Sequence, residues 1–314
     1  MNPDALAARL TTAGVRVERD VPVADLSTYH LGGPVAVLAR VGSPAELASL
    51  AAAFSGAADG EPSPPLLVVG RGSNLLVADT GFAGLGLVLD GDFDTVELEA
   101  GPATVRAGAA VALPVLARRA AGAGRTGLEF YVGIPGTVGG AVRMNAGGHG
   151  RETADVLVEA EVADLATGGT VSSRPLAALG FGYRCSALAP TEVVTGATFR
   201  VVDGDAPAAE AEVAAIVRWR RENQPGGSNA GSVFANPPGD SAGRLVDSLG
   251  LKGLRVGGAV VSAKHANFFQ AEAGATADDV RRLVVEVRRR VLDATGIELV
   301  PELRMVGFED EAPR

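Results

Sequence analysis

Apolar and polar residues recur along this chain with two different periods, which predict helices and strands in turn. Five apolar residues near the end keep helical spacing, with arginines on the opposite face: Val280, Leu283, Val284, Val287 and Val291. Further helices are predicted over 44–53, 113–121, 206–221 and 241–249. Short apolar or alternating runs predict strands at 65–70, 86–89, 95–99, 156–162 and 193–202. Such a mixture is typical of an α+β fold.

Local signals sharpen two of these predictions. Ser43-Pro-Ala-Glu46 combines a capping serine, a proline at the first helical position and a glutamate that can complete a capping box. The strand at 65–70 ends at a glycine. Glycines also crowd around 70–72, 133–148, 226–231 and 250–258. Such clusters mark turns where the backbone takes positive φ or passes close to a partner.

Length and charge narrow the class of protein. The 314 residues suggest two or three domains, with boundaries near 90 and 205. The net charge of −9 argues against a nucleic-acid groove built on bulk positive potential. One cysteine, Cys185, excludes an internal disulfide, and three histidines leave no Cys/His metal cluster. The start has no basic n-region and no segment approaches a membrane span, so we expect a soluble, cytoplasmic protein without a resident metal.

Two glycine-rich motifs are candidate phosphate sites. Gly70-Arg-Gly-Ser-Asn74 follows a predicted strand, and its small residues can aim backbone N–H groups at a phosphate, or simply form a tight turn. Leu75 stands where a dinucleotide fingerprint needs its third glycine. Gly133-Ile-Pro-Gly-Thr-Val-Gly-Gly140 predicts a rigid loop beside a close partner, either a ligand pyrophosphate or another strand.

Taken one at a time, the other motifs do not indicate a particular function. Gly239-Asp-Ser-Ala-Gly243 matches a hydrolase elbow, but prolines precede it and Asp247 shares the predicted helix, so we interpret it as a chance match. Asp240 or Ser241 is then a helix cap. Considered alone, Arg184 is a surface charge, Ser232 a turn hydroxyl and Glu302 a strand-end acid.

Eight motifs taken in order, however, resemble one family, the UDP-N-acetylenolpyruvoylglucosamine reductases of bacterial peptidoglycan synthesis. They cover about 28–307 in the family's order and approximate spacing. They are Thr28-Tyr-His-Leu-Gly-Gly-Pro34, Gly70-Arg-Gly-Ser-Asn-Leu-Leu76, Gly127-Leu-Glu-Phe130 with the glycine loop, Tyr183-Arg-Cys-Ser186, Gly231-Ser-Val-Phe234, Leu251-Lys-Gly253 with Gly257-Gly-Ala259, Lys264-His-Ala-Asn267, and Pro301-Glu-Leu-Arg304.

The resemblance implies an α+β fold with a two-part FAD-binding unit of the vanillyl-alcohol-oxidase type and an α/β substrate-binding domain. The expected parts are 1–90, rejoined by the tail 300–314, then 91–205, and a substrate-binding domain over 206–299. It also implies non-covalent FAD, NADPH as hydride donor, and reduction of the enolpyruvyl group of a UDP-sugar to give UDP-N-acetylmuramate. We expect a monomer with no nucleic-acid or membrane partner.

The resemblance also implies the catalytic residues, which are Ser232 as proton donor together with Arg184 and Glu302. Their chemistry agrees with these roles. Hydride addition to an enol ether conjugated to a carboxylate pushes negative charge toward the carboxylate, where an arginine offers fixed donors and permanent charge. Glu302 can help hold the enolate. The carbanion is basic enough for a serine hydroxyl to protonate it.

The remaining implied site residues fall into two sets. The cofactor set is Tyr29, Gly70, Arg71, Gly72, Ser73, Asn74, Gly133, Ile134, Pro135, Gly136, Thr137, Gly139 and Gly140. The substrate set is Tyr183, Asn229, Asn236, Lys264, His265 and Asn267.

This chain departs from the family in two places. Many members carry a lysine in an Arg-x-x-Lys run, where this chain has Arg220-Arg-Glu-Asn223. Some members close the site with a tyrosine-bearing loop after the Tyr-Arg motif, and this chain has only Tyr29, Tyr131 and Tyr183. Two alternatives stay open: another FAD-dependent oxidase or dehydrogenase of sugars or alcohols on the same fold, and a non-enzymatic nucleotide-sugar binding protein.

Overall fold

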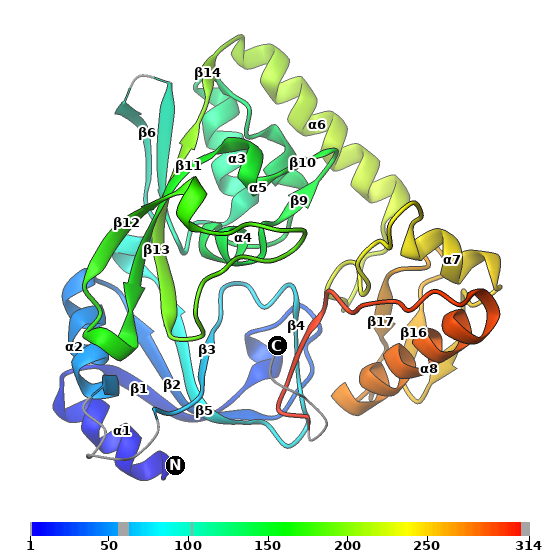
Figure 1. Ribbon diagram of the computed structural model, residues 1–314, viewed down its shortest axis with the longest axis horizontal. Helices are drawn as coiled ribbons and strands as arrows, with labels where there is room; N and C mark the ends of the chain where they lie inside the picture. Colours follow the sequence, from blue (N-terminus) through cyan, green and yellow to red (C-terminus); the bar gives the residue numbers. More distant parts are fainter. Residues whose placement is uncertain (1, 56–62, 102, 309–314) are drawn as a thin grey trace. The chain divides into compact units, whose positions relative to one another are not determined.

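The computed structural model describes residues 2–55, 63–101 and 103–308 (Figure 1). Contacts group the chain into two compact units, each built from three stretches of sequence. Unit 1 comprises Met1–Arg19, Ala36–Arg71 and Ala83–Trp219. Unit 2 comprises Asp20–Val35, Gly72–Phe82 and Arg220–Arg314. Three domains are expected from the sequence, each defined by the ligand that it binds. That division stays a prediction.

The first sheet has the strand order β1-β2-β5-β3. Its strands are β1 (Arg16–Pro22), β2 (Pro34–Val41), β5 (Phe82–Leu89) and β3 (Leu66–Val68), and β3 runs parallel to β5. Helices α1 (Pro3–Thr12) and α2 (Pro44–Ser55) contact each other, and α2 buries Leu47, Leu50 and Phe54 in a core shared with the sheet. The apolar spacing of α2 is what directs this face inward.

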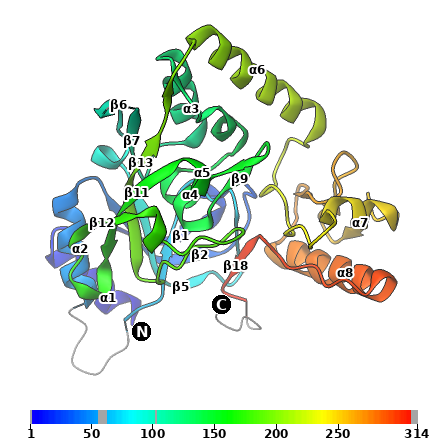
Figure 2. The same ribbon diagram turned by 45° about the horizontal axis from the view of Figure 1, so that its top comes forward.

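The second sheet of unit 1 is antiparallel throughout, with the order β12-β11-β13-β7-β6. Its strands are β12 (Val171–Pro175), β11 (Leu157–Asp164), β13 (Glu192–Arg200), β7 (Thr104–Gly108) and β6 (Val96–Gly101). Helices α3 (Leu113–Gly122) and α4 (Val138–Met144) share its core, onto which α6 (Ala206–Asn223) packs Ala209, Val213 and Ile216 (Figure 2).

Small elements complete unit 1. The helix α5 (Thr153–Val156) follows a two-stranded hairpin of β9 (Gly147–Gly148) and β10 (Arg151–Glu152). The strand β8 (Arg125–Thr126) pairs with β14 (Val202–Asp203). Short 3₁₀ turns span Gly91–Phe93, Glu129–Gly133, Leu165–Thr167 and Leu176–Ala178, and a further one at Val23–Asp25 belongs to unit 2.

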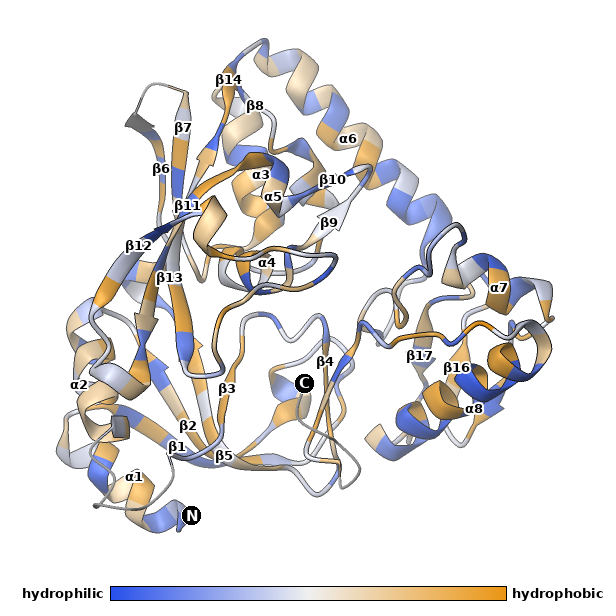
Figure 3. Cartoon of the chain, viewed as in Figure 1, coloured by the Kyte–Doolittle hydropathy of each residue, from blue (hydrophilic) through white to orange (hydrophobic). Residues whose placement is uncertain are grey.

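Unit 2 holds two further sheets and two helices. Strand β4 (Leu75–Val77) pairs in parallel with β18 (Arg304–Val306), and β15 (Arg255–Val256), β16 (Ala259–Val261) and β17 (Phe269–Ala271) form an antiparallel sheet. Helices α7 (Ala242–Ser248) and α8 (Ala277–Thr295) share one core with that sheet. Apolar and polar residues separate onto opposite faces of α8 in Figure 3. No helix among the described residues is both long enough and apolar enough to cross a membrane.

Both ends of α8 are set by local chemistry. Thr276 Oγ1 accepts from the Asp279 N–H at 3.1 Å, and the Asp279 carboxylate accepts from the Thr276 N–H at 3.2 Å, which is a capping box. The Asp79 carboxylate accepts two more first-turn N–H groups, those of Ala277 and Asp278. The helix ends at Gly296, whose φ of 72° suits glycine.

The helices and strands predicted from the sequence are confirmed, with ends shifted by a few residues. The prediction of an irregular loop throughout 133–140 was wrong in its second half, because α4 begins at Val138. Val138, Ala141 and Val142 are buried, so packing outweighs the weak helix propensity of the two glycines between them. The capping box at Ser43 is incomplete, since the Glu46 carboxylate accepts from the Gly42 N–H instead of that of Ser43.

Candidate active site

Gly70 begins a turn directly after β3 and packs against the glycine loop. A Cβ added at Gly70 would lie 2.6 Å from Thr137 Oγ1, which is closer than real contacts allow. Thr137 in turn caps α4 by accepting from the Gly140 N–H at 3.3 Å. Both residues belong to unit 1, so this unit brings the two motifs predicted to hold the cofactor into direct contact.

The rest of the same turn lies in unit 2, where Gly72 leaves no room for a side chain. Its φ is 58°, and an added Cβ would lie 2.2 Å from the Leu26 carbonyl oxygen and 2.5 Å from Ser27 Cα. Beside it, Ser27 Oγ and Thr28 Oγ1 are buried without a hydrogen-bond partner in the described part of the chain. Buried hydroxyls are usually paired. Two unpaired hydroxyls beside a bare backbone turn therefore fit a polar ligand such as the phosphates or flavin of FAD.

Tyr29, the next residue, is a core side chain in unit 2. It is 1% exposed, and its hydroxyl donates to the Phe269 carbonyl oxygen at 3.0 Å. Burial raises the pKa of Tyr29 far above its usual value, so the phenol stays protonated. The phenol is thus engaged by β17, and the expected contact of Tyr29 with the cofactor stays a prediction.

Two glycines of the 133–140 motif have protein partners. A Cβ at Gly133 would lie 2.7 Å from the His149 ring, and one at Gly139 would lie 3.1 Å from Ala109 Cβ. Protein atoms therefore lie close to both of these positions. Roles for Gly133, Ile134, Pro135, Gly136, Thr137, Gly139 and Gly140 in cofactor binding stay predictions.

Arg184 lies at the tip of a tight turn in unit 1. Its guanidinium donates to the carbonyl oxygens of Gly147 at 3.0 Å and Asn145 at 3.4 Å. The guanidinium also lies over the Tyr183 ring, 4.9 Å from its centre. Tyr183 itself is 53% exposed. Arg184 is therefore oriented by backbone carbonyls and an aromatic ring, which the interpretation as a plain surface charge did not anticipate.

Ser232, Glu302 and Asn74 come together in unit 2 from three distant segments. The Glu302 N–H donates to the Val233 carbonyl oxygen at 2.8 Å, next to Ser232. The Asn74 amide donates to the Glu302 carbonyl oxygen at 3.0 Å, and the Arg304 N–H donates back to the Asn74 carbonyl oxygen at 3.1 Å. Asn74, at one end of the turn predicted to bind the cofactor, is thus hydrogen-bonded to Glu302, a predicted catalytic residue.

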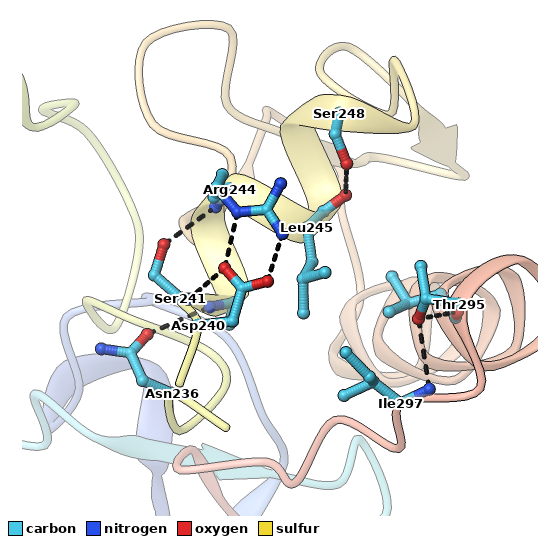
Figure 4. A network of polar contacts seen from close by, with 10 residues as sticks. Asn236, Asp240, Ser241, Arg244, Leu245, Ser248, Thr295 and Ile297 are labelled. Atoms are coloured by element: carbon cyan, nitrogen blue, oxygen red, sulfur yellow. Dashed lines mark hydrogen bonds and ion pairs between the residues drawn. The ribbon is translucent and has the colours of Figure 1, made fainter. Parts of the chain in front are cut away.

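The asparagines predicted to bind substrate all make contacts within unit 2. Asn267, 3% exposed, pairs its amide with both backbone groups of Phe234, accepting at 3.0 Å and donating at 2.8 Å. Asn236 accepts from the Ala242 N–H at the start of α7 (Figure 4). Asn229 organises its own loop, accepting from the Gly231 N–H. These contacts hold the Gly-Ser-Val-Phe turn in place, and a role in substrate binding stays a prediction for each.

Lys264 and His265 lie in the loop before β17. Lys264 Nζ donates to the Arg221 carbonyl oxygen at 2.5 Å, at the end of α6. His265 Nδ1 accepts from the Asn267 N–H at 3.3 Å. Burial, and then the charge of Lys252, lower the pKa of His265, so the ring is neutral at neutral pH.

The literal Gly-x-Ser-x-Gly motif is a helix cap. Ser241 Oγ accepts from the Arg244 N–H at 3.2 Å, while the Asp240 carboxylate binds the Arg244 guanidinium (Figure 4). Asp247 lies on the same helix α7, as predicted. Within residues 2–55, 63–101 and 103–308, no three His, Cys, Asp or Glu residues gather where they could hold a metal ion.

Two family models match this chain, and they identify first its class and then its family. A family model described as an FAD binding domain matches residues 35–174, which defines a flavin-binding fold of the expected α+β class. A second model, the C-terminal domain of UDP-N-acetylenolpyruvoylglucosamine reductase, matches residues 223–306. The chain belongs to the UDP-N-acetylenolpyruvoylglucosamine reductase family, because its similarity to reductases of that name extends over nearly its whole length.

Two of those reductases show the extent of the similarity. One from Methylorubrum extorquens is 44% identical over 98% of this chain and 96% of its own. The one from Paramagnetospirillum magneticum is 42% identical over 95% of this chain and 94% of its own. The crystal structure of the reductase from Thermus caldophilus matches this chain with a TM-score of 0.78 and 39% sequence identity. The match covers 93% of this chain and 100% of the Thermus chain. The family and fold predicted from the eight motifs are confirmed.

No site role was assigned to Ser27, Thr28 or Asn145 from the sequence. Ser27 precedes the first motif and Thr28 begins it, but nothing in the sequence reveals that their hydroxyls are buried without partners. Asn145 lies among glycines, and its partner Gly182 is distant in sequence.

Proposed function

We propose that this chain reduces the enolpyruvyl group of UDP-N-acetylenolpyruvoylglucosamine to give UDP-N-acetylmuramate, a step in peptidoglycan precursor synthesis. NADPH reduces non-covalently bound FAD in the proposed cycle. Membership of the reductase family supports the reaction. In this chain, the observation that supports the proposal is the hydrogen bond between Asn74, in the turn predicted to bind the cofactor, and Glu302.

Each unit, taken by itself, offers groups that suit the cofactor. In unit 2, Gly72 has no side chain over its backbone. The Ser27 and Thr28 hydroxyls have no hydrogen-bond partner in the described part of the chain. In unit 1, Gly70 and the 133–140 loop contribute small residues, while the N–H groups of Ile134, Val138 and Gly139 already donate to backbone carbonyl oxygens. When bound, FAD supplies the hydride that adds to the enolpyruvyl double bond.

The chain's own side chains stabilise the charge that this addition creates. Arg184 offers a planar, permanently charged guanidinium whose orientation is fixed by two carbonyl oxygens. A preorganised donor of this kind stabilises charge that develops on the substrate carboxylate. Glu302, whose backbone is held by Val233 and Asn74, donates a hydrogen bond to the same enolate from its protonated carboxyl group in the proposed cycle.

Ser232 completes the reaction by protonating the carbanion-like carbon. Its hydroxyl is carried on a turn whose next residues, Val233 and Phe234, bond to Asn267 through three separate hydrogen bonds. Such a fixed backbone keeps the Cβ that carries the hydroxyl at one position. A positioned acid contributes about 10²–10⁴-fold to a rate.

Lys264 supplies a lysine beside the Arg220-Arg-Glu-Asn223 run, which contains none. Its ammonium group donates to the Arg221 carbonyl oxygen from the loop before β17. The ammonium therefore lies beside the run in which many family members carry their lysine. A charge there suits the diphosphate of the UDP-sugar.

The flavin's colour tests the proposal. Purified protein should be yellow, should bleach with NADPH under anaerobic conditions, and should regain colour when the enolpyruvyl UDP-sugar is added. A colourless protein would support the nucleotide-sugar binding alternative, and rapid recolouring in air without substrate would support an oxidase. A cytoplasmic location and a monomeric state remain part of the proposal.

A further inference from the structure

The backbone of Arg184 is held in a conformation that an arginine rarely adopts. The turn from Gly182 to Cys185 is closed by the Cys185 N–H donating to the Gly182 carbonyl oxygen at 3.3 Å. Arg184, at its third position, has a φ of 57°. Turns with positive φ there normally use glycine or asparagine, because a Cβ costs about 1–2 kcal/mol in this region. Such an outlier persists only when its surroundings hold it.

Asn145 is the residue that holds this turn. Its side chain is buried, with residue exposure of 1%, and its Nδ2 donates to the Gly182 carbonyl oxygen at 3.0 Å. Its Oδ1 accepts from the Ala154 N–H at 2.9 Å, which anchors the amide to α5. Its own carbonyl oxygen accepts from the Arg184 guanidinium. One residue thus contacts both the base of the turn and the charged group at its tip.

The segment around Asn145 also secures the far side of the turn. Ser186 Oγ donates to the Arg143 carbonyl oxygen at 2.8 Å, and Arg184 donates to Gly147 at 3.0 Å. Asn145 itself ends α4 with a φ of 41°, a region that asparagine tolerates better than most residues. The choice of asparagine therefore serves two needs at once, a left-handed helix end and an amide directed at the turn.

We propose that Asn145 is a positioning residue for Arg184: its amide fixes the turn that presents the guanidinium to the substrate carboxylate. This inference rests on the proposed role of Arg184. Without the bond from Nδ2, the Gly182 carbonyl oxygen keeps only the Cys185 N–H as a donor, and the turn can relax toward negative φ at Arg184. The guanidinium would then move, and displacement of a reacting group by about 1 Å can slow a reaction by about 10²-fold.

Two substitutions separate positioning from simple support of the fold. Asn145→Gly keeps the left-handed backbone and removes both hydrogen bonds of the side-chain amide, while Asn145→Asp keeps the acceptor for Ala154 but turns a carboxylate oxygen, in place of the donor, toward the Gly182 carbonyl oxygen. Both should retain FAD and be reduced by NADPH at the normal rate. Both should be reoxidised by the enolpyruvyl UDP-sugar about 10- to 100-fold more slowly, with weaker binding of that substrate to the oxidised protein by calorimetry.

A double-mutant cycle with Arg184→Ala gives the decisive comparison. If Asn145 acts through Arg184, Asn145→Gly should slow reoxidation no further once Arg184 is alanine. The matched control is Thr195→Val, which removes another buried hydrogen bond of unit 1, from Thr195 Oγ1 to the Glu161 carbonyl oxygen, and should change neither half-reaction. Equal slowing by Asn145→Gly in both backgrounds, or equal slowing of both half-reactions, would overturn the inference. Failure of the unsubstituted protein to reoxidise with this substrate would instead refute the proposed function.

Discussion

The side-chain amide of Asn74 donates a 3.0 Å hydrogen bond to the backbone carbonyl of Glu302. The two residues are 228 positions apart in the sequence, and the parallel pairing of β4 with β18 brings them together. The bond joins the turn that is proposed to hold FAD to Glu302, a proposed catalytic residue just before β18. Cofactor binding and the substrate step should therefore share a residue.

Removing this bond should affect both properties together. Asn74→Ala should reduce the free energy of unfolding by about 1 kcal/mol, the usual contribution of one hydrogen bond. It should also weaken FAD binding and slow reoxidation by substrate. Flavin titration of the apoprotein and stopped-flow absorbance measure the two effects. Loss of FAD affinity with a fully normal substrate step would show that Glu302 does not depend on this bond.

Gly72 should be required for FAD binding because of the space around it. Gly72→Ala places a Cβ against the Leu26 carbonyl oxygen and should give folded but largely colourless protein. Gly274→Ala is the matched control, since Gly274 has a φ of 81° with nothing within 4 Å of an added Cβ. Both variants carry a backbone penalty of about 1 kcal/mol, and only Gly72→Ala should lose flavin. Full flavin occupancy in Gly72→Ala would count against this site.

Arg184→Lys should not behave as a conservative change. Lysine keeps the charge but loses the planar fork that grips a carboxylate with two bonds, so reoxidation by substrate should slow by about 10²–10³-fold. Transient kinetics with the enolpyruvyl UDP-sugar measures this step. A rate near that of the unsubstituted protein would place Arg184 away from the reacting carboxylate.

The strained backbone at Arg184 gives a separate prediction about stability. Arg184→Gly and Arg184→Ala both remove the guanidinium, but only alanine keeps a Cβ at a φ of 57°. The glycine variant should therefore be the more stable by about 1 kcal/mol in chemical denaturation. Equal stability of the two variants would mean that the turn is relaxed in solution.

His265 should make stability depend on pH below about 6.5, its ordinary pKa. Burial lowers the pKa of His265 in the folded state, so as the pH falls the unfolded chain binds the proton first. The free energy of unfolding should fall from about pH 6.5 down to the folded-state pKa, and less so in His265→Gln. Denaturation at about pH 7.5 and about pH 5.5, one unit to either side of that ordinary value, tests this. An identical pH dependence in the two proteins would exclude His265 as the cause.

Sequence patterns predicted the helices α2, α3, α6, α7 and α8 and the strands β3, β5, β6, β11 and β13 because their cause is local, whereas α1, β1 and β2 were not predicted. The apolar stripe of α8 and the capping serine before α2 are visible within a few residues of each position. The helix α4 was missed because its glycines lower local helix propensity and only burial of Val138 and Val142 reveals it. Local pattern and tertiary packing disagreed there, and packing decided the outcome.

The candidate site was less accessible to residue patterns alone. Ser232 and Glu302 each looked ordinary in sequence, and only the order of eight motifs gave them a role. The bond from Asn145 to Gly182 spans 37 residues, and that from Asn74 to Glu302 spans 228. Contacts over such separations depend on the folded backbone, which no periodic pattern encodes.

The central claim is that Ser232 donates the proton after hydride transfer, and Ser232→Ala tests it most directly. The two half-reactions should be followed separately by flavin absorbance without oxygen. The variant should bind FAD and be reduced by NADPH at an unchanged rate, while reoxidation by the enolpyruvyl UDP-sugar slows by about 10²-fold or more. Slower reduction by NADPH with unchanged reoxidation by the substrate would contradict the account.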